Sequence, residues 1–478
     1  MNFRLRSSAR PIQIKEQASN PKEALSPAAA IALIVGLVIG AGIFKAPALV
    51  AGMTGSVGWM FGAWVLGGIM SLIGALCYAE LATTYPHPGG DYHFLSRAYG
   101  KSLSFLFAWA RFAVISTGSI ALLGFIFGDY LSLLLPVPGV TPAIGSALYA
   151  AAMIVMLSLL NLRGIRTGAR AQTWLTVLEV AGLLLIVLAA VMAPPQTAPV
   201  VTHAAPGVAS FGLAMVFVLL TFGGWNEAAY ISAELKDRQR NMGRVLLVSL
   251  AIISALYLLV IWAYWRGLGM SGMARADAVA ASLLYLSFGH AGQAIMAALV
   301  MIAAVTSMNA TIITGARSSY AAGCDWPMLA HLGQWHGQRG TPANAMRVQC
   351  VMALLLVALG ALTSDGFRAM VEFTAPVFWL FFLLSGLSLF VLRWRDPAQA
   401  RPFRVPLYPV TPLLFCAMCV FMLWSSLSYV SSQSLGGFNA AWIGVAVLGA
   451  GLLMLWRMRT NVRASARPLS DQPKRRIP

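Results

Sequence analysis

Long apolar runs recur from one end of the chain to the other, and they restrict its fold more than any other feature. Twelve runs, each bounded by Pro, Gly or charged residues, lie at about 28–50, 58–83, 103–135, 143–161, 172–193, 209–233, 243–265, 279–322, 346–363, 371–394, 407–430 and 437–457. A helix needs about 20 mostly apolar residues to cross the hydrocarbon core of a bilayer. Because 59% of the 478 residues are apolar and only 10% are charged, few residues remain for a water-soluble core. The sequence therefore predicts an all-α membrane protein with 12 transmembrane helices.

Other classes of protein do not fit this pattern. Transmembrane strand barrels use segments of about ten residues that alternate in hydrophobicity, whereas these runs are continuously apolar. A soluble globular protein and a disordered chain would both carry far more charge. The five cysteines lie in or beside apolar runs, and the six histidines are scattered. We therefore expect no disulfide framework, no metal site and no cofactor.

Positive charge falls mainly on alternate connections between the runs. The formal net charge is +18, but the basic residues form short clusters rather than one basic and aromatic surface, so nucleic-acid binding is not expected. One set of connections, with the two tails, holds 28 Lys and Arg residues, and the opposite set holds only Arg266, Arg275 and Arg368. Basic residues favour the cytoplasmic side of a membrane. We expect a multi-pass protein of the cell inner membrane whose tails, 1–27 and 458–478, are both cytoplasmic.

The first and sixth runs contain glycines near their centres. Gly36, Gly40 and Gly42 lie in the first run, and Gly223 and Gly224 lie in the sixth. Glycine weakens a helix by about 1 kcal/mol relative to alanine, although close packing of helices through small residues would explain either segment alone. The two segments occupy matching positions in two five-helix halves, and interrupted helices at matching positions mark the substrate sites of transporters. We therefore predict that helices 1 and 6 are broken.

A broken helix offers unpaired peptide groups to a ligand. The half-helix that begins after Gly42 presents free N–H groups and a positive dipole end, which suit a carboxylate. The half-helices that end at the interruptions present unpaired carbonyl groups, which suit an ammonium group. An anion site beside a cation site matches an α-amino acid, so an amino acid is the expected substrate.

Four segments carry a resemblance to a known family. They are VIGAGIF (38–44), LCYAELATTYPHPGGDY (76–92), TFGGWNEAAYISAEL (221–235) and SMNATIITGARSSYAAG (307–323). With these segments the chain resembles the amino acid–polyamine–organocation (APC) superfamily, and it is most similar to the L-type amino acid transporter branch and its bacterial permeases. The resemblance implies a LeuT-like fold, with inverted five-helix repeats at 28–193 and 209–394, followed by helices 11 and 12 at 407–457.

The resemblance also implies a function. It implies secondary active transport of amino acids across the membrane by alternating access, as an exchanger or as a proton symporter. Phe44, Phe222 and Trp225 around the interruptions favour neutral substrates. A polyamine or cationic amino acid antiporter of the same superfamily stays open as an alternative. A membrane-embedded enzyme would need clustered carboxylates or His and Cys ligands, which the sequence does not show.

The resemblance places the substrate-binding residues in the two interruptions. They are Val38, Ile39, Gly40, Ala41, Gly42, Ile43, Leu220, Phe222, Gly223, Gly224, Trp225 and Asn226. The chain departs from the family pattern at three positions: Ala41 replaces a small hydroxyl residue, Leu220 replaces an aromatic lid, and Gly182 aligns with a lysine near the coupling-ion position. The third departure leaves the identity of the coupling ion open.

Charged residues inside the runs are candidates for gating or coupling, because a charge at the centre of a bilayer costs about 2.5–3.5 kcal/mol on insertion scales. Lys45 and Glu227 each follow an interruption, and they either pair as a gate or reach the outer vestibule separately. Glu179 of the fifth run either carries a proton or neutralises Arg111 of the third.

Two further acidic residues flank the PHPGG loop. Glu80 and Asp91 are expected to pair with Arg97 or Arg317 near the cytoplasmic end of the second helix. Thr306, Ser307 and Asn309 of the eighth run could line a sodium-like site, but we expect their polar groups to bond to helix carbonyls instead.

Overall fold

Helices make up nearly all of the chain that the computed structural model describes. The described residues are 26–87, 90–162, 169–193, 205–227, 235, 237–334, 342–363, 365–430, 434–435, 438–439 and 446–457. In chain order the elements are α1 (Pro27–Val38), η1 (Ala41–Phe44), α2 (Ala46–Thr54), α3 (Val57–Thr84), α4 (Asp91–Tyr99), α5 (Lys101–Ala110), η2 (Arg111–Ile115), α6 (Ser116–Leu134), α7 (Pro142–Leu162), α8 (Ala169–Met192), α9 (Val208–Thr221), η3 (Trp225–Glu227), α11 (Arg238–Arg275), α12 (Val279–Asp325), η5 (Pro327–Leu329), α13 (Ala343–Gly360), α14 (Gly366–Arg395), α15 (Val410–Val430), β1 (Ser434–Leu435) and β2 (Phe438–Asn439). The strands β1 and β2 pair antiparallel, η2 is π-helical, and the other η elements are 3₁₀ helices.

Eight helices within the described residues are long and apolar enough to cross a membrane. They are Val57–Thr84, Lys101–Leu134, Pro142–Leu162, Asn241–Arg275, Val279–Asp325, Ala343–Gly360, Gly366–Arg395 and Val410–Tyr429. Shorter apolar helices lie at Val177–Met192, Val208–Thr221 and Ala446–Arg457. The predicted helical membrane protein is therefore confirmed, while the predicted total of 12 spans and the LeuT-like arrangement stay predictions.

The two longest of these helices, α11 and α12, change direction within their length. The backbone leaves the helical conformation at Gly269 within α11 and at Gly289 within α12. A straight helix of 47 residues, the length of α12, would measure roughly 70 Å at 1.5 Å per residue, more than twice the hydrocarbon thickness. The kink at Gly289 divides this length between two helical segments.

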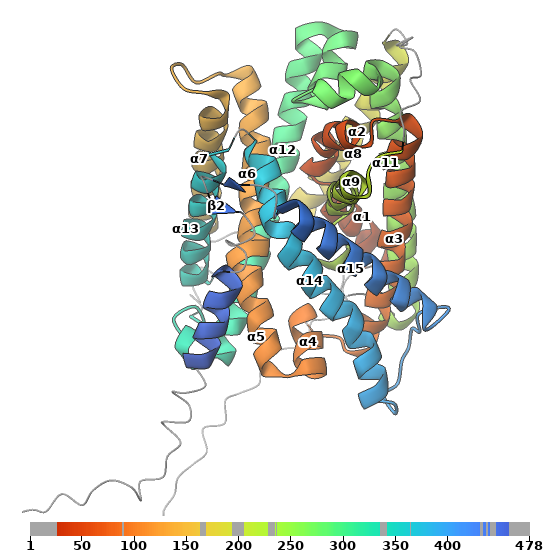
Figure 1. Cartoon of the computed structure of the whole chain (residues 1–478), viewed down its shortest axis with the longest axis vertical. Coiled ribbons are helices and arrows are strands. Elements are labelled where there is room, and N and C mark those ends of the chain that lie inside the picture. Colours follow the sequence, from red (N-terminus) through yellow and green to blue (C-terminus); the bar gives the residue numbers. More distant parts are fainter. Residues whose placement is uncertain are drawn as a thin grey trace, which may run out of the picture.

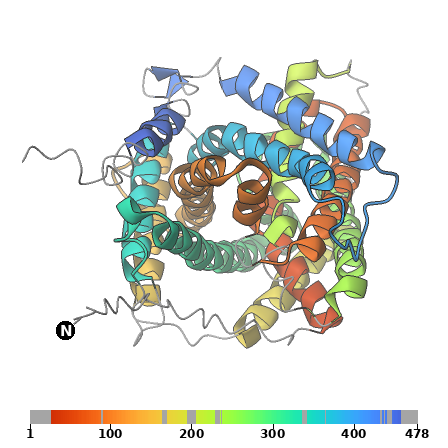
Figure 2. The same cartoon turned by 90° about the horizontal axis from the view of Figure 1, so that it is seen from below.

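The helices form two groups that meet along the centre of the bundle. Helix α11 packs against α1, α2, α3 and α8, and α9 packs against α2 and α3; we call these six helices the α11 group. Helix α6 packs against α7, α12, α13 and α14; we call these five the α6 group. Figure 1 shows the α11 group mainly at the right and the α6 group mainly at the left. Helix α15 contacts both α9 and α14, and Figure 2 shows α14 and α15, in cyan and blue, along one side of the bundle.

Apolar side chains fill the interior and also cover much of the outside. Large aromatic residues such as Trp64, Tyr130 and Tyr257 are fully buried. On α7, by contrast, Leu148 and Leu159 are exposed. An apolar outer surface of this kind would be unfavourable in water and suits contact with lipid.

Candidate functional site at two interrupted helices

The first helix is interrupted where the sequence predicts. Helix α1 ends at Val38, the backbone is extended at Gly40 (φ −103°, ψ −176°), and η1 leads into α2 through Lys45. Gly40 precedes η1 and supplies no side chain to cap its first N–H groups. These peptide groups are therefore able to donate hydrogen bonds to a ligand.

The sixth run is also interrupted, close to its paired glycines. Helix α9 ends at Thr221, and the N–H of Gly223 donates to the carbonyl of Leu220 at 2.9 Å. Gly224 then adopts φ +107°, a conformation that side chains with a Cβ atom rarely adopt. Because of this turn, the chain leaves the axis of α9 before η3 begins.

The two interruptions lie against each other and share one buried hydroxyl group. A Cβ atom at Gly42 would lie 3.3 Å from Oγ1 of Thr221, so the absence of a side chain at Gly42 allows this close approach. The hydroxyl of Tyr257, on α11, lies 2.9 Å from the carbonyl oxygen of Val38 and 3.0 Å from that of Thr221. These carbonyls belong to the last residues of α1 and α9, and Tyr257 is fully buried. Tyr257 thus ties together the two ends that the sequence predicts to bind substrate.

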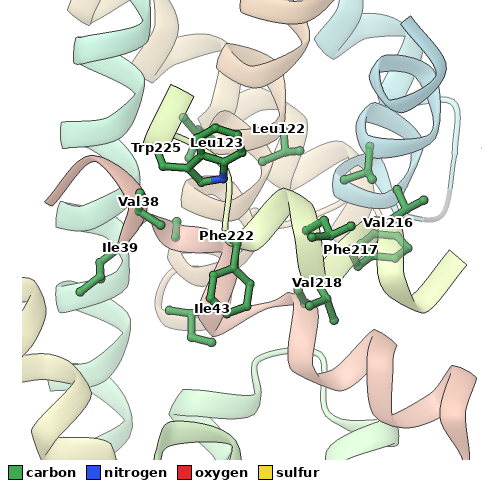
Figure 3. Close-up of a cluster of buried hydrophobic side chains, with 14 of the residues drawn as sticks. Val38, Ile39, Ile43, Leu122, Leu123, Val216, Phe217, Val218, Phe222 and Trp225 are labelled. Carbon is green, nitrogen blue, oxygen red and sulfur yellow. The ribbon is translucent and has the colours of Figure 1, made fainter. Parts of the chain in front are cut away.

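Aromatic side chains line the same region. Phe222 packs against Tyr257 with ring centroids 5.0 Å apart, and Trp225 packs against Tyr78 at 5.3 Å and Phe382 at 5.4 Å. Figure 3 shows Phe222 and Trp225 near Val38 and Ile43, where the ribbons of α1 and α9 lose their helical course. The side chains of the site are therefore mostly apolar, and its polar groups are peptide groups, the hydroxyls of Tyr257, Thr221 and Ser307, and the amide of Asn226.

The structure brings together the residues predicted to bind substrate. Seven of their side chains are buried: Val38, Ile39, Ala41, Ile43, Phe222, Trp225 and Asn226. Leu220 is partly buried in the last turn of α9. A cavity of about 10 Å³ lies beside Gly223 and Trp225, enough for about one water molecule. A substrate would need this region to open.

A much larger cavity lies on one side of the interruptions. It has a volume of about 540 Å³, and its walls come from α2, the beginning of α9, the end of α11, the beginning of α14 and Tyr429. Its charged lining residues are Lys45, Arg275, Asp277, Asp365 and Arg368. We call this side of the bundle the cavity end. Helix α3 begins next to α2 and runs away from the cavity toward α4, so we call the opposite side the α4 end.

Comparison with known proteins identifies the family. The family model for amino acid permeases matches residues 25–448. The chain belongs to the amino acid permease family. It is 29% identical over 419 residues to the large neutral amino acids transporter small subunit 2 of Mus musculus, covering 84% of this chain and 77% of that protein.

Other transporters show a similar relation to this permease. The b(0,+)-type amino acid transporter 1 of Homo sapiens is 29% identical over 401 residues, covering 82% of the chain and 80% of that protein. The Asc-type amino acid transporter 1 of Mus musculus is 27% identical over 450 residues, covering 92% of the chain and 82% of that protein. The resemblance found in the four sequence segments is thus confirmed. The family and these relatives are transporters rather than enzymes.

Lys45 of the permease has a partner that the sequence did not identify. Its Nζ donates to Oδ2 of Asp129 at 2.8 Å, and the Ser146 hydroxyl donates to the other oxygen, Oδ1, at 2.6 Å. The side chain of Glu227 lies outside the described residues, so its predicted pairing with Lys45 stays a prediction. One signal could have revealed the observed partner, because Asp129 is the only carboxylate in the run 103–135.

Glu179 and Arg111 are both buried, and no hydrogen bond joins them. Neither carboxylate oxygen of Glu179 has a hydrogen-bond partner within the described part of the chain, although the side chain is only 4% exposed. Arg111 lies at the start of the π-helical segment η2. Burying an unpaired carboxylate is costly unless it binds a proton or another cation.

The polar residues of α12 mostly bond within the protein. The hydroxyl of Thr306 donates to the carbonyl of Ile302 at 2.8 Å, as the sequence predicts. Oδ1 of Asn309 accepts a hydrogen bond from Asn161 at 2.7 Å. Within the described residues, no three His, Cys, Asp or Glu side chains lie close enough together to hold a metal ion.

The α4 end is held by a buried cluster around Glu80. Arg393 donates through Nε at 2.7 Å and through its terminal nitrogen at 2.5 Å, so the contact is bidentate. The backbone N–H of Val405 donates at 2.7 Å, and Nε of Arg401 lies 3.7 Å away. The prediction that Glu80 pairs with Arg97 or Arg317 was therefore wrong, because tertiary packing brings the end of α14 and the segment after it to α3.

A second, more exposed cluster lies beside it. Asp396 accepts hydrogen bonds from Arg97 at 2.9 Å and from the hydroxyl of Tyr85 at 3.1 Å. These two donors lower the pKa of Asp396 below its usual value. Asp91 accepts from Tyr78 at 2.7 Å and from Ser385 at 2.9 Å. Both clusters connect α3 or α4 to α14 and the residues that follow it.

Proposed function

We propose that this permease moves amino acids across the inner membrane by alternating access, with neutral amino acids as its main substrates. The observation that carries the proposal is the pair of interrupted helices whose ends meet at Tyr257 in a chain of this family. The relatives named as large neutral amino acid and Asc-type amino acid transporters support the choice of substrate.

Each half of the amino acid has its own set of peptide groups in this proposal. The N–H groups at the start of η1, from Ala41 to Ile43, hold the carboxylate. The carbonyl groups at the ends of α1 and α9 receive the ammonium group, which displaces the Tyr257 hydroxyl from at least one of them. Phe222 and Trp225 contact the side chain of the substrate, and their apolar surface favours neutral side chains.

We infer that the permease has twelve membrane spans in total. Beyond the eight long apolar helices, α1 with α2, α8, α9 with η3, and the helix Ala446–Arg457 correspond to the four remaining runs. The α4 end carries Arg97, Lys101, Arg393, Arg395 and Arg401, so we assign this end to the cytoplasm. The cavity end then faces the outside of the cell.

Glu179 supplies the coupling step in this proposal. A protonated Glu179 is neutral and tolerates its buried position, whereas the ionised form requires a cation nearby. Symport would release the proton at the cytoplasmic side together with the substrate. If the protein is instead an exchanger, Glu179 keeps its proton throughout the cycle.

Uptake by the purified protein in liposomes tests the proposal. Labelled neutral, cationic and acidic amino acids and a polyamine are supplied, with and without internal substrate and with and without a pH gradient. We expect saturable uptake of neutral amino acids, competed by free amino acids but not by their N-acetyl or methyl ester forms, each of which lacks one charged group. Uptake of polyamines alone, or uptake competed equally by both blocked forms, would contradict the proposed substrate class.

A further inference from the structure

Two consecutive residues of α6 connect the α6 group to the first interruption. Asp129 accepts from Lys45 at 2.8 Å, and the hydroxyl of Tyr130 donates to the carbonyl of Phe44 at 3.1 Å. Phe44 ends η1, and Lys45 leads into α2. Since α2 belongs to the α11 group, both contacts cross the boundary between the two helix groups at the segment that holds the substrate carboxylate.

One of these contacts is fully buried and the other is partly buried. Tyr130 is fully buried, and the side chains of Lys45 and Asp129 are 11% and 28% exposed. The bond from Ser146 fixes the orientation of the Asp129 carboxylate toward Lys45. Removing one member of such a partly buried ion pair leaves an uncompensated charge, which is far more disruptive than loss of an exposed pair.

Lys45 also has acidic groups within reach on its other side. It lines the 540 Å³ cavity together with Asp277 and Asp365. Asp277 follows the end of α11, and Asp365 precedes α14. If the contact with Asp129 broke, the ammonium group would therefore face a cavity with two carboxylates and the guanidinium groups of Arg275 and Arg368, rather than an apolar interior. The charge of Lys45 thus does not prevent the contact from opening.

We propose that Lys45, Asp129 and Tyr130 form a latch that closes the substrate site toward the cavity end. With the latch formed, α2 is held against α6 and the η1 peptide groups are fixed in place. When it breaks, Lys45 turns toward Asp277 and Asp365, α2 moves away from α6, and the site opens to the cavity. The three are positioning residues, since they act through η1 and α2. The role of the latch in transport rests on the proposed function. The latch contacts themselves can be tested in protein that is not transporting.

Accessibility of the closed site tests the latch without requiring transport. Ala41, which is fully buried, is replaced by cysteine in the full-length protein after Cys324, the exposed native cysteine, is replaced by serine. The rate of labelling by a membrane-impermeant maleimide from the cavity side is then measured. We expect Asp129→Asn to raise this rate about tenfold or more, in keeping with loss of a partly buried charge partner. Tyr130→Phe, which removes one hydrogen bond, should raise it about threefold to tenfold.

A control variant and a charge-exchange variant complete the labelling experiment. Asp396→Asn removes an ion pair at the α4 end and should leave the rate unchanged. The double variant Lys45→Asp/Asp129→Lys should return the rate toward that of the parent protein. The latch is wrong if both Asp129→Asn and Tyr130→Phe, eluting as the parent does in size-exclusion chromatography, label at the parent rate. Failure of the parent to transport amino acids would instead count against the proposed function and leave the labelling result standing.

Discussion

The two ends of the permease are held together in different ways. At the α4 end, one buried carboxylate, Glu80, receives a bidentate contact from Arg393 and a backbone hydrogen bond. At the cavity end, about 540 Å³ of open volume lies next to Lys45, whose ammonium is bonded to a partly exposed aspartate. The structure is thus closed firmly toward α4, whereas the contacts of the proposed latch close the substrate site toward the cavity end.

This asymmetry has a consequence for the transport cycle. In the proposed latch, opening toward the cavity breaks one ion pair and one tyrosine hydrogen bond. Opening toward α4 requires separation of α3 from α14, which would expose Glu80 or leave it buried without a partner. The α4 end therefore contributes more to the stability of this conformation than the cavity end does.

The largest expected effect follows from the Glu80 cluster. Glu80→Gln removes the charge that compensates Arg393 and Arg401, and we expect it to destabilise the protein by about 3–5 kcal/mol, the range for a buried pair that loses one partner. The thermal unfolding midpoint of the purified protein in detergent measures this effect. Asp396→Asn, which disrupts a more exposed pair on the same side, serves as the control. Equal midpoints for the two variants would remove the distinction between a firmly and a weakly closed end.

We expect the next largest effect from substitution of Tyr257, because its hydroxyl contacts both interruptions. Tyr257→Phe removes the one hydroxyl proton that the carbonyl groups of Val38 and Thr221 share, which costs about 1–3 kcal/mol and should lower initial uptake about tenfold. Tyr264→Phe is a matched control, since Tyr264 is also buried on α11 and its hydroxyl has no hydrogen-bond partner in the described part of the protein. If Tyr264→Phe impaired uptake as strongly, the bridge between the interruptions would not be the cause.

Substitution of Glu179 tests a residue that belongs to neither of the two end clusters. Glu179→Gln keeps the shape of the side chain but cannot release a proton. We expect its uptake to lose the dependence on pH that the parent shows, with little change in thermal stability, because no hydrogen bond to Glu179 is present in the described residues. Uptake is measured in liposomes at external pH values between about 5 and 8, where a symporter and an exchanger differ most. A variant that kept the full pH dependence would exclude the proton role.

A smaller effect is expected from the histidine pair at the α4 end. His87 and His93 stack with centroids 4.2 Å apart, and burial, with the positive charges of His87 and Arg97, lowers the pKa of His93 to about 4. The unfolded chain, with a usual pKa near 6.5, binds the proton first. The stability due to neutral His93 is therefore full above about pH 6.5 and is lost as the pH falls toward 4.

His93→Gln should thus reduce the fall in the thermal midpoint between pH 7 and pH 5. His290→Gln, on α12 beside Tyr285, is the control and should behave as the parent does. A His93 variant with the same acid sensitivity as the parent would show that the pair does not contribute to the stability of the α4 end.

The sequence could predict those features that depend on local composition. Apolar runs revealed the membrane helices, and the glycines at 40, 42, 223 and 224 revealed both interruptions, because they act on the backbone of their own segment. Asp129 and the Arg393 partner of Glu80 could not be assigned in this way, since 84 and 313 residues separate the members of these pairs. Tyr257 is one of four hydroxyl residues in the run 243–265, and only the packing of α11 against α1 distinguishes it from the others.

Binding of an amino acid to the purified protein tests most directly the claim that the two interruptions form the substrate site. Gly42→Val places methyl groups against Thr221 and should fill the space between the interruptions, whereas Gly62→Val adds the same groups where a Cβ atom meets nothing within 4 Å. We predict that a transported amino acid raises the thermal midpoint of the parent and of Gly62→Val, but not that of Gly42→Val. Equal stabilisation of all three proteins would contradict the account.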